Sequence, residues 1–126
     1  MRPLTWVAAA ILLVIAAPAP ADEPRVGLAS YYAQSLDGKI TASGLRFRND
    51  AMVAAHPTYP FGTIVRVTNL RNGRAVSVQI IDRGPSAGPR KEGVIIDLSC
   101  AAATALGFIE RGRTRVRVRV LKAAPS

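Results

Sequence analysis

The sequence predicts a mainly β protein, folded as a small closed β-barrel with one short helix. Three observations lead to this fold class. Several short segments alternate apolar and polar residues, as half-buried strands do. The segments between them are rich in glycine and proline, which mark turns and loops. A single alanine-rich segment carries the signals of a helix start and a helix stop.

Five segments have the composition of strands, because they are short, rich in β-branched or aromatic residues, and mostly alternating. They are residues 27–33, 64–69, 75–81, 94–96 and 114–121. The second and third are joined through Asn72-Gly73, a dipeptide typical of tight hairpin turns. We therefore expect these two strands to pair with each other as a hairpin.

The remaining segments predict loops and one helix. Residues 34–49 and 82–93 are rich in glycine or polar residues and predict loops, and residues 50–55 predict one helical turn. The helix follows the Asp-Leu-Ser motif, with Asp97 or Ser99 as its N-cap. It runs through the alanines to Leu106 and stops at the following glycine.

The first 21 residues have the layout of a secretory signal peptide rather than of a domain. Arg2 precedes an apolar run over residues 6–17, and small residues at 19–21 form a cleavage signal. An uncleaved membrane anchor is the alternative, but the run is short for a membrane span. We expect residues 1–21 to be removed, leaving one domain over residues 22–126 without a C-terminal sugar-binding repeat domain.

No cysteine follows the apolar run, so we expect an exported protein of the periplasm or cell envelope that carries no lipid anchor. No transmembrane segment is expected after removal of the signal peptide. Cys100 is the only cysteine, which excludes an intramolecular disulfide, and its place in the helical segment favours a buried structural thiol.

The chain is strongly basic, with a formal net charge of +9 at pH 7. A basic domain can bind nucleic acid, but an exported protein meets other polyanions, so we expect no nucleic-acid partner. Arginines recur at every second position near the C-terminus: Arg111, Arg113, Arg115, Arg117 and Arg119. This stripe is either a solvated strand face that prevents edge pairing or a surface that binds a polyanion.

Few residues could carry chemistry. His56 is the only histidine, and Asp82 stands where a predicted strand ends and a loop opens, a frequent place for functional residues. Each also has a structural interpretation, His56 as a histidine bonded to the backbone and Asp82 as a loop cap. No cluster of ligands at metal-binding spacing is present, and neither a nucleophile elbow nor a phosphate-binding glycine loop occurs, so we expect no metal and no cofactor.

Several motifs in the same order resemble the rare lipoprotein A family, a group of septal-ring lytic-transglycosylase-like proteins. The resemblance covers about residues 26 to 121. The motifs are Gly27-Leu28-Ala29-Ser30-Tyr31-Tyr32, Thr41-Ala42-Ser43-Gly44, Ala54-Ala55-His56-Pro57-Thr58, Pro60-Phe61-Gly62-Thr63, Val67-Thr68-Asn69-Leu70, Asn72-Gly73-Arg74, Asp82-Arg83-Gly84-Pro85 and Ile95-Ile96-Asp97-Leu98-Ser99.

The resemblance implies a six-stranded double-psi β-barrel and peptidoglycan as the substrate class. It also implies lytic transglycosylase activity, with a preference for glycan strands that lack stem peptides. The family's active-site trio is a glutamate, a histidine and an aspartate, and His56 and Asp82 match the last two. Leu45, which cannot transfer a proton, stands at the glutamate position. Glu92 lies in a later loop, and nothing in the sequence places it at the same point in space.

A lytic transglycosylase needs few protein groups, because the 6-hydroxyl of muramic acid is itself the nucleophile and leaves a 1,6-anhydromuramic end. One carboxyl can protonate the leaving oxygen and then accept the hydroxyl proton. We assign Asp82 as this acid/base and His56 as its helper, and predict an endolytic enzyme of cell-wall remodelling.

A non-cleaving glycan-binding module that resembles expansins is the alternative, and a structural or inhibitory partner is a third hypothesis. The glycan strands are the predicted partner, and we expect a monomer. The predicted substrate-binding residues are Tyr31, Tyr32, Thr41, Tyr59 and Arg83. Aromatic side chains stack on sugar rings, although core packing is their commoner role.

Overall fold

A computed structural model describes residues 23–125 of the chain, together with residues 3 and 10. The predicted signal peptide, residues 1–21, lies almost entirely outside the described residues, so its removal stays a prediction. Within the part of the chain that the structure describes, none of the helices combines the length and the apolar character needed to cross a membrane.

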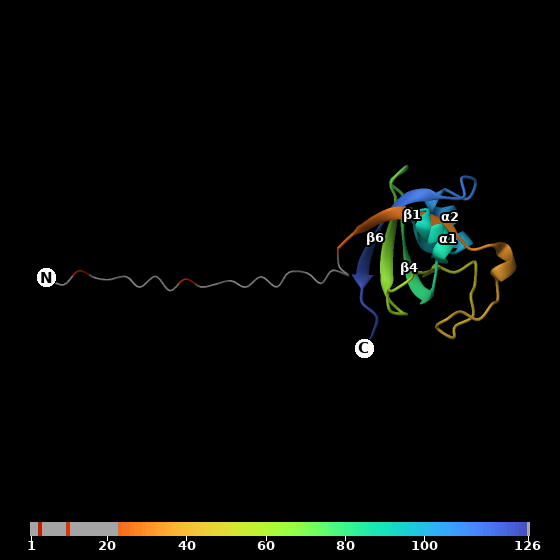
Figure 1. Cartoon of the computed structure of the whole chain (residues 1–126), viewed down its shortest axis with the longest axis horizontal. Helices are drawn as coiled ribbons and strands as arrows, with labels where there is room; N and C mark the ends of the chain where they lie inside the picture. Colours follow the sequence, from red (N-terminus) through yellow and green to blue (C-terminus); the bar gives the residue numbers. More distant parts are fainter. Residues whose placement is uncertain (1–2, 4–9, 11–22, 126) are drawn as a thin grey trace.

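Six strands close into one barrel (Figure 1), which confirms the closed barrel predicted from the sequence and the six strands implied by the family resemblance. Around the barrel their order is β1-β5-β2-β4-β3-β6, and β6 pairs with β1 to complete it. Two pairs are parallel, β1 with β5 and β2 with β4, and the other four are antiparallel. The bounds are β1 Arg25–Tyr31, β2 Val53–Ala55, β3 Ile64–Asn69, β4 Ala75–Asp82, β5 Val94–Leu98 and β6 Thr114–Lys122.

The barrel interior is filled by the apolar residues of the alternating strands. Along β6, Val116 and Val118 are buried while Arg115, Arg117 and Arg119 are exposed, which confirms the two-residue period. The same pattern in β3 and β5 places Val65, Val67 and Ile96 in the core. Closure removes the free sheet edges that an open six-stranded sheet would present.

The helix predicted after the Asp-Leu-Ser motif is confirmed as α2, Cys100–Leu106. The Ser99 side chain caps it by accepting a hydrogen bond from the Ala102 amide, and Gly107 ends it with a left-handed φ of 78°. Asp97, the other predicted cap, lies instead inside β5. Strand β5 is longer than residues 94–96 because its later residues pair with both β1 and β2.

Two local predictions are wrong. Residues 53–55 form strand β2 rather than part of a helical turn, because Ala54 and Ala55 fill the gap between β4 and β5. The loop predicted over residues 82–93 contains a short helix, α1 (Ala87–Lys91), so the fold has more than one helix. A further helical turn, η2 (Gln34–Leu36), begins the long loop after β1. Tertiary pairing overrides weak local preference in such short segments.

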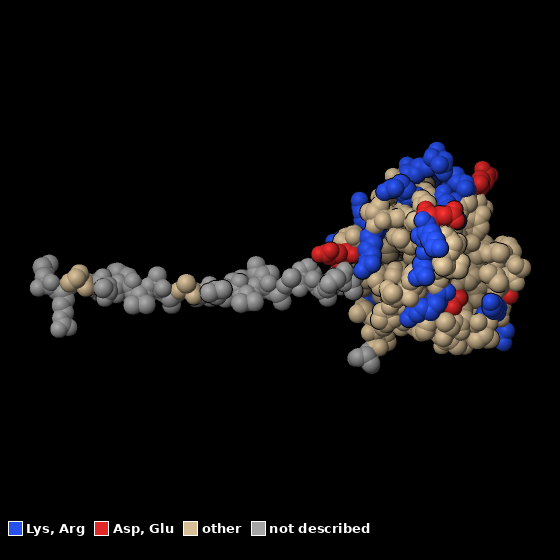
Figure 2. All heavy atoms as spheres, in the orientation of Figure 1, with Lys and Arg blue, Asp and Glu red and all other residues tan. Residues whose placement is uncertain are grey.

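The arginines of β6 lie on the outer wall of the barrel, where Arg119 faces Arg66 of β3 across the ladder. Figure 2 shows lysine and arginine side chains spread over the visible face, with few acidic groups among them. Among the described residues, one ion pair is present, between Arg113 and Glu92 at 3.1 Å. The stripe is therefore solvated and largely uncompensated, and polyanion binding by it stays a hypothesis.

Candidate active site

Asp82 ends strand β4, and its carboxylate gathers three hydrogen-bond donors from separate parts of the chain. The Tyr32 hydroxyl donates to Oδ2 at 2.5 Å, and the amides of Ala42 and Arg83 each donate to Oδ1 at 2.9 Å. Tyr32 follows β1, whereas Ala42 belongs to the long loop after it. The carboxylate therefore holds this loop against the barrel end, and both of its oxygens are bonded.

Tyr32 is suited to remain a donor to Asp82. Its ring stacks on Phe47, with centroids 4.1 Å apart. Burial, together with the hydrogen bond to Asp82 and the negative charge there, raises the pKa of the Tyr32 hydroxyl above its ordinary value. The hydroxyl consequently keeps its proton and remains a hydrogen-bond donor to Asp82.

Asp97 is a second carboxyl at this end of the barrel, and sequence reasoning missed it as a site residue. It pairs in the β2–β5 ladder with Ala55, which is also the ladder partner of Asp82. One buried alanine thus stands between the two aspartates, whose Cα atoms are therefore separated by two inter-strand spacings, roughly 10 Å. A signal was present, because both strands end an apolar run with the same Ile-Ile-Asp sequence.

The surroundings of Asp97 differ from those of Asp82. The Ser30 hydroxyl donates a hydrogen bond to Asp97 Oδ1. The backbone of Gly84, with a φ of 145°, packs beside Oδ2: a Cβ at this glycine would stand 3.2 Å from it. Burial raises the pKa of Asp97, and the charge of Asp82 adds to this effect, while Ser30 and Arg113 oppose it. Asp97 therefore retains a proton to higher pH than a solvated aspartate.

His56 follows β2 and is buried, with 5% of its surface exposed. Its Nδ1 accepts hydrogen bonds from the amides of Thr58 and Tyr59 at 3.1 and 3.0 Å, and its ring stacks on that of Tyr59 at 3.7 Å. Burial, then the positive charges of Arg25 and Arg83, lower the pKa of His56 from 6.5 to about 4. At neutral pH the imidazole is uncharged and carries its proton on Nε2.

Two other predicted site residues, Arg83 and Thr41, donate hydrogen bonds to backbone carbonyl oxygens of the surrounding loops. Arg83 donates to the carbonyl oxygens of His56 and Tyr59 at 3.3 and 2.8 Å, and lies 3.9 Å over the Phe61 ring, so it clamps this loop. Thr41 is buried and donates to the Leu45 carbonyl at 2.6 Å. These two residues shape the loops around the carboxyls, and direct contact with a substrate stays a prediction for both.

Tyr31 and Tyr59 are occupied within the protein. The Tyr31 hydroxyl donates to the Ile109 carbonyl at 2.7 Å, and its ring meets Phe108 edge-on. The Tyr59 ring is buried, and its hydroxyl has no hydrogen-bond partner among the described residues. Of the predicted aromatic residues, Tyr32 is the one that bonds a carboxyl of the site.

The structure also locates Leu45, which stands at the family's glutamate position, and Glu92, the acid that lies in a later loop. Leu45 is 54% exposed on the loop that supplies the Ala42 amide to Asp82. Glu92 follows α1 as its C-cap and pairs with Arg113, and it is not among the donors or neighbours found at Asp82. Within the described residues, no group of histidine, cysteine and acidic side chains is arranged to hold a metal ion.

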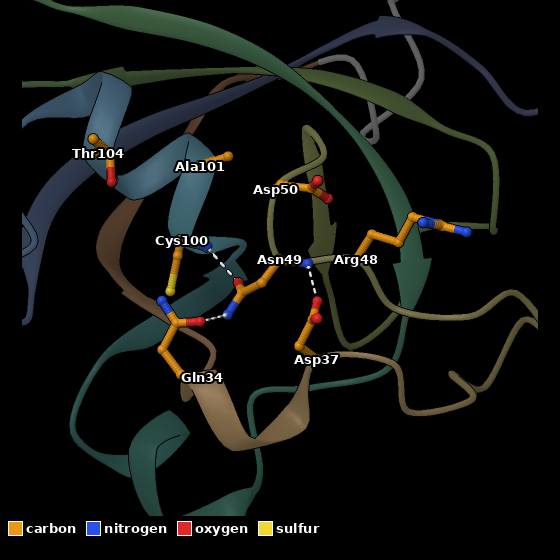
Figure 3. Close-up of a pocket in the computed structure, with 8 residues that line it drawn as sticks. All are labelled: Gln34, Asp37, Arg48, Asn49, Asp50, Cys100, Ala101 and Thr104. Atoms are coloured by element: carbon orange, nitrogen blue, oxygen red, sulfur yellow. Dashed lines mark hydrogen bonds between the residues drawn. The ribbon is translucent and has the colours of Figure 1, made fainter.

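A pocket of about 360 Å³ has neither Asp82 nor Asp97 in its lining. It lies between the long loop and the start of α2 (Figure 3). We call it the Cys100 pocket, and it is lined by Gln34, Asp37, Arg48, Asn49, Asp50, Cys100, Ala101 and Thr104. The side-chain oxygen of Asn49 accepts a hydrogen bond from the Cys100 backbone amide at 2.7 Å. The backbone N–H of Asn49 donates to the Asp37 carboxylate at 2.8 Å. These bonds tie the loop to the helix.

Comparison with solved structures supports the barrel topology. The chain is similar to Streptomyces papain inhibitor, with a TM-score of 0.64 and 26% identity over 82% of this chain and 98% of that one. It is also similar to the apo expansin of Clavibacter michiganensis, with a TM-score of 0.63 and 22% identity over 82% of this chain and 53% of that one. Both are double-psi β-barrel proteins.

Comparison with families and curated relatives gives a more specific result. A family model described as lytic transglycolase matches residues 25–118. The probable endolytic peptidoglycan transglycosylase RlpA of Synechocystis sp. is 48% identical over 96 residues, which are 76% of this chain and 29% of that protein. The endolytic peptidoglycan transglycosylase RlpA of Haemophilus influenzae is 47% identical over 100 residues, which are 79% and 33%. The chain thus spans about a third of the length of these relatives, and it belongs to the rare lipoprotein A family of double-psi β-barrel proteins.

Proposed function

We propose that the protein is an endolytic peptidoglycan lytic transglycosylase that cleaves glycan strands and leaves 1,6-anhydromuramic ends. The observation that carries this proposal is the pair of aspartates on either side of Ala55, held in unlike surroundings. Two carboxyls in unlike environments can divide the acid and base roles. The relatives named as endolytic peptidoglycan transglycosylases support the same reaction.

Asp97 is the acid in this mechanism, because its raised pKa favours the protonated form. It gives its proton to the glycosidic oxygen as the bond between that oxygen and C1 of muramic acid breaks. The 6-hydroxyl oxygen of the same muramic acid then bonds to C1 and closes the anhydro ring. No water is consumed, and the second sugar leaves with the proton from Asp97.

Asp82 is the base that receives the proton of the attacking 6-hydroxyl. Both of its oxygens are hydrogen-bonded, but Oδ2 accepts only the Tyr32 hydroxyl and keeps a further lone pair. The three donors orient the carboxylate before the reaction. This assignment moves the acid role, which the sequence analysis placed on Asp82, to Asp97 on β5, with β2 between the two strands.

The mechanism runs without the family's glutamate, whose position is taken by the exposed Leu45. The loss of one acid/base group typically lowers a rate by about 100- to 10,000-fold, so Leu45 also favours the second candidate, a non-cleaving glycan-binding module. An exported monomer in the cell envelope, with a preference for strands that lack stem peptides, completes the proposal.

The test incubates the purified protein and its Asp82→Asn variant with intact sacculi and with amidase-denuded glycan strands. Mass spectrometry then measures 1,6-anhydromuramic ends. The proposal expects these ends from the wild type and a loss of at least about 100-fold from the variant. Binding of both proteins to the strands without anhydro products would instead establish the binding module.

A further inference from the structure

A further pocket, of about 280 Å³, lies between the segment that follows β2 and the start of β5. We call it the His56 pocket, and it is lined by Arg25, His56, Pro57, Thr58, Arg90, Val94 and Ile95. Two of these residues fix its place relative to Asp97. Ile95 precedes Asp97 by two residues in β5, a step of roughly 7 Å, and His56 follows Ala55, the ladder partner of Asp97.

The imidazole of His56 supplies this pocket with a hydrogen-bond donor in a fixed orientation. The side chain is 95% buried, and two backbone amides and the stacked Tyr59 ring hold it in place. Since Nδ1 accepts both amides, Nε2 carries the proton, and His56 is one of the residues that line the pocket. An N–H at the wall of a pocket is available to donate a hydrogen bond to a bound ligand.

The charged residues that line this pocket are both positive. Arg25 and Arg90 line the pocket, and none of the lining residues is acidic. The one ion pair among the described residues joins Arg113 to Glu92, so neither lining arginine is paired there. The positive charge of Arg25 reaches the imidazole, where it contributes to the lowered pKa. A cation is repelled from such a pocket, whereas an anion finds two guanidinium groups and an N–H donor.

We propose that the His56 pocket is a subsite for a carboxylate of the glycan strand, bound by Arg25, Arg90 and the Nε2–H of His56 beside the bond that is cleaved. The inference rests on the proposed function, because that function makes peptidoglycan the substrate. Peptidoglycan offers two sources of this group. They are the lactyl carboxylate of a muramic acid without its stem peptide and the carboxylates of an attached stem peptide.

In this arrangement His56 is a binding residue rather than a proton shuttle. Its two neighbouring arginines hold the carboxylate, and the fixed imidazole selects its position. A bound muramic acid is then aligned along β5 so that the next glycosidic oxygen lies toward Asp97. Orientation of this kind lowers the barrier by placing the reacting groups in advance.

The test compares an Arg25→Gln/Arg90→Gln variant with an Arg117→Gln/Arg119→Gln control. Both variants lose two positive charges, and the control positions are exposed on the outer wall of β6. Calorimetry measures binding to denuded glycan strands and to the same strands with their carboxylates converted to amides. We expect amidation to weaken binding by the wild type and the control about 10- to 100-fold, and to leave the Arg25→Gln/Arg90→Gln variant within twofold.

Strands that keep their stem peptides identify the source of the carboxylate. If denuded strands alone show the amidation effect, the lactyl carboxylate occupies the pocket, and if peptide-bearing strands show it, a stem carboxylate does. The inference is overturned if amidation weakens the Arg25→Gln/Arg90→Gln variant as much as the control.

Anhydro ends separate this failure from failure of the proposed function. If the Arg25→Gln/Arg90→Gln variant forms anhydro ends with an unchanged KM, the proposed cleavage is supported and the carboxylate subsite is contradicted. If amidation weakens binding by the wild type but no anhydro ends form, the carboxylate subsite is supported and the proposed cleavage is contradicted.

Discussion

The site of the two aspartates and the Cys100 pocket are both bordered by the long loop after β1, yet their polar groups are arranged differently. In the Cys100 pocket the polar groups bond one another: Asn49 joins Asp37 to the Cys100 amide, and the Cys100 thiol donates to the Tyr32 carbonyl at 3.3 Å. At the aspartates, two carboxyls share one buried alanine as ladder partner, and the pKa of Asp97 is raised.

This difference distinguishes a structural polar cluster from a chemical one. Groups that satisfy each other stabilise a single conformation and have little left to offer a substrate. A carboxyl held in an unfavourable charge state costs stability and supplies reactivity, which is why perturbed groups gather at functional sites. Tyr32 connects the two regions, since its carbonyl serves the Cys100 pocket while its hydroxyl serves Asp82.

The change expected to separate the two regions most is Asp97→Asn. We expect the rate of anhydro-end formation to fall by about 100- to 10,000-fold, because the acid is removed. Asp50→Asn, a matched change in the Cys100 pocket, should leave the rate within twofold. Mass spectrometry of released products measures both variants. Equal losses in the two would contradict the assignment of Asp97.

The raised pKa of Asp97 also fixes the direction of two pH effects. Its contribution to folding stability is complete below the pKa of the unfolded state and is lost as pH rises through the folded pKa. Asp97→Asn should therefore unfold at a higher temperature than the wild type at neutral pH. In the wild type, kcat/KM should fall as pH rises and Asp97 loses its proton.

The next largest effect is a loss of stability in weak acid, caused by His56. Its folded pKa of about 4 lies below the ordinary 6.5, so the neutral form stabilises the fold above pH 6.5. This contribution, at most about 3 kcal/mol, should disappear as pH falls toward 4. Urea unfolding at several pH values measures it. In His56→Gln the loss over this interval should be smaller, and an unchanged loss would assign it to other groups.

A loss of stability without a change in chemistry is expected from Asn49→Ala in the Cys100 pocket. The side chain is buried, and its removal leaves the Cys100 amide without its acceptor. We expect a decrease of about 2 kcal/mol in the free energy of unfolding, measured with urea. Gln34→Ala, an exposed neighbour whose bond to Asn49 is long at 3.5 Å, is the control and should change stability by less than about 0.5 kcal/mol.

The smallest effect concerns Leu45, which borders the carboxyl site from the same loop. Because its side chain is exposed, Leu45→Glu should fold normally and restore a proton-transfer group at the family's glutamate position. We expect the rate to rise by about 10-fold, less than a fully positioned group provides. Met52→Glu, another exposed apolar position, should give no increase. A rise in both variants would indicate a general charge effect.

Much of the scaffold follows from local sequence patterns. Strand β3 occupies the predicted residues, β4 and β6 each extend one residue beyond theirs, and α2 has the cap and the terminal glycine expected of it. Asp82 could be singled out because it directly follows an apolar strand. The period of two along a strand and the capping of a helix are properties of neighbouring residues, so one sequence carries them.

Closure of the barrel decided the rest. Three residues were too few to predict β2, which forms because β4 and β5 bond it from both sides. The same pairings place Asp97 across Ala55 from Asp82, although 14 residues separate the two aspartates in the chain. The tautomer of His56 and its arginine-lined pocket likewise depend on contacts between distant segments. By itself the sequence determined which residues could react, and the tertiary structure decided which of them share a site, because strand pairing and burial are set by contacts that no local pattern records.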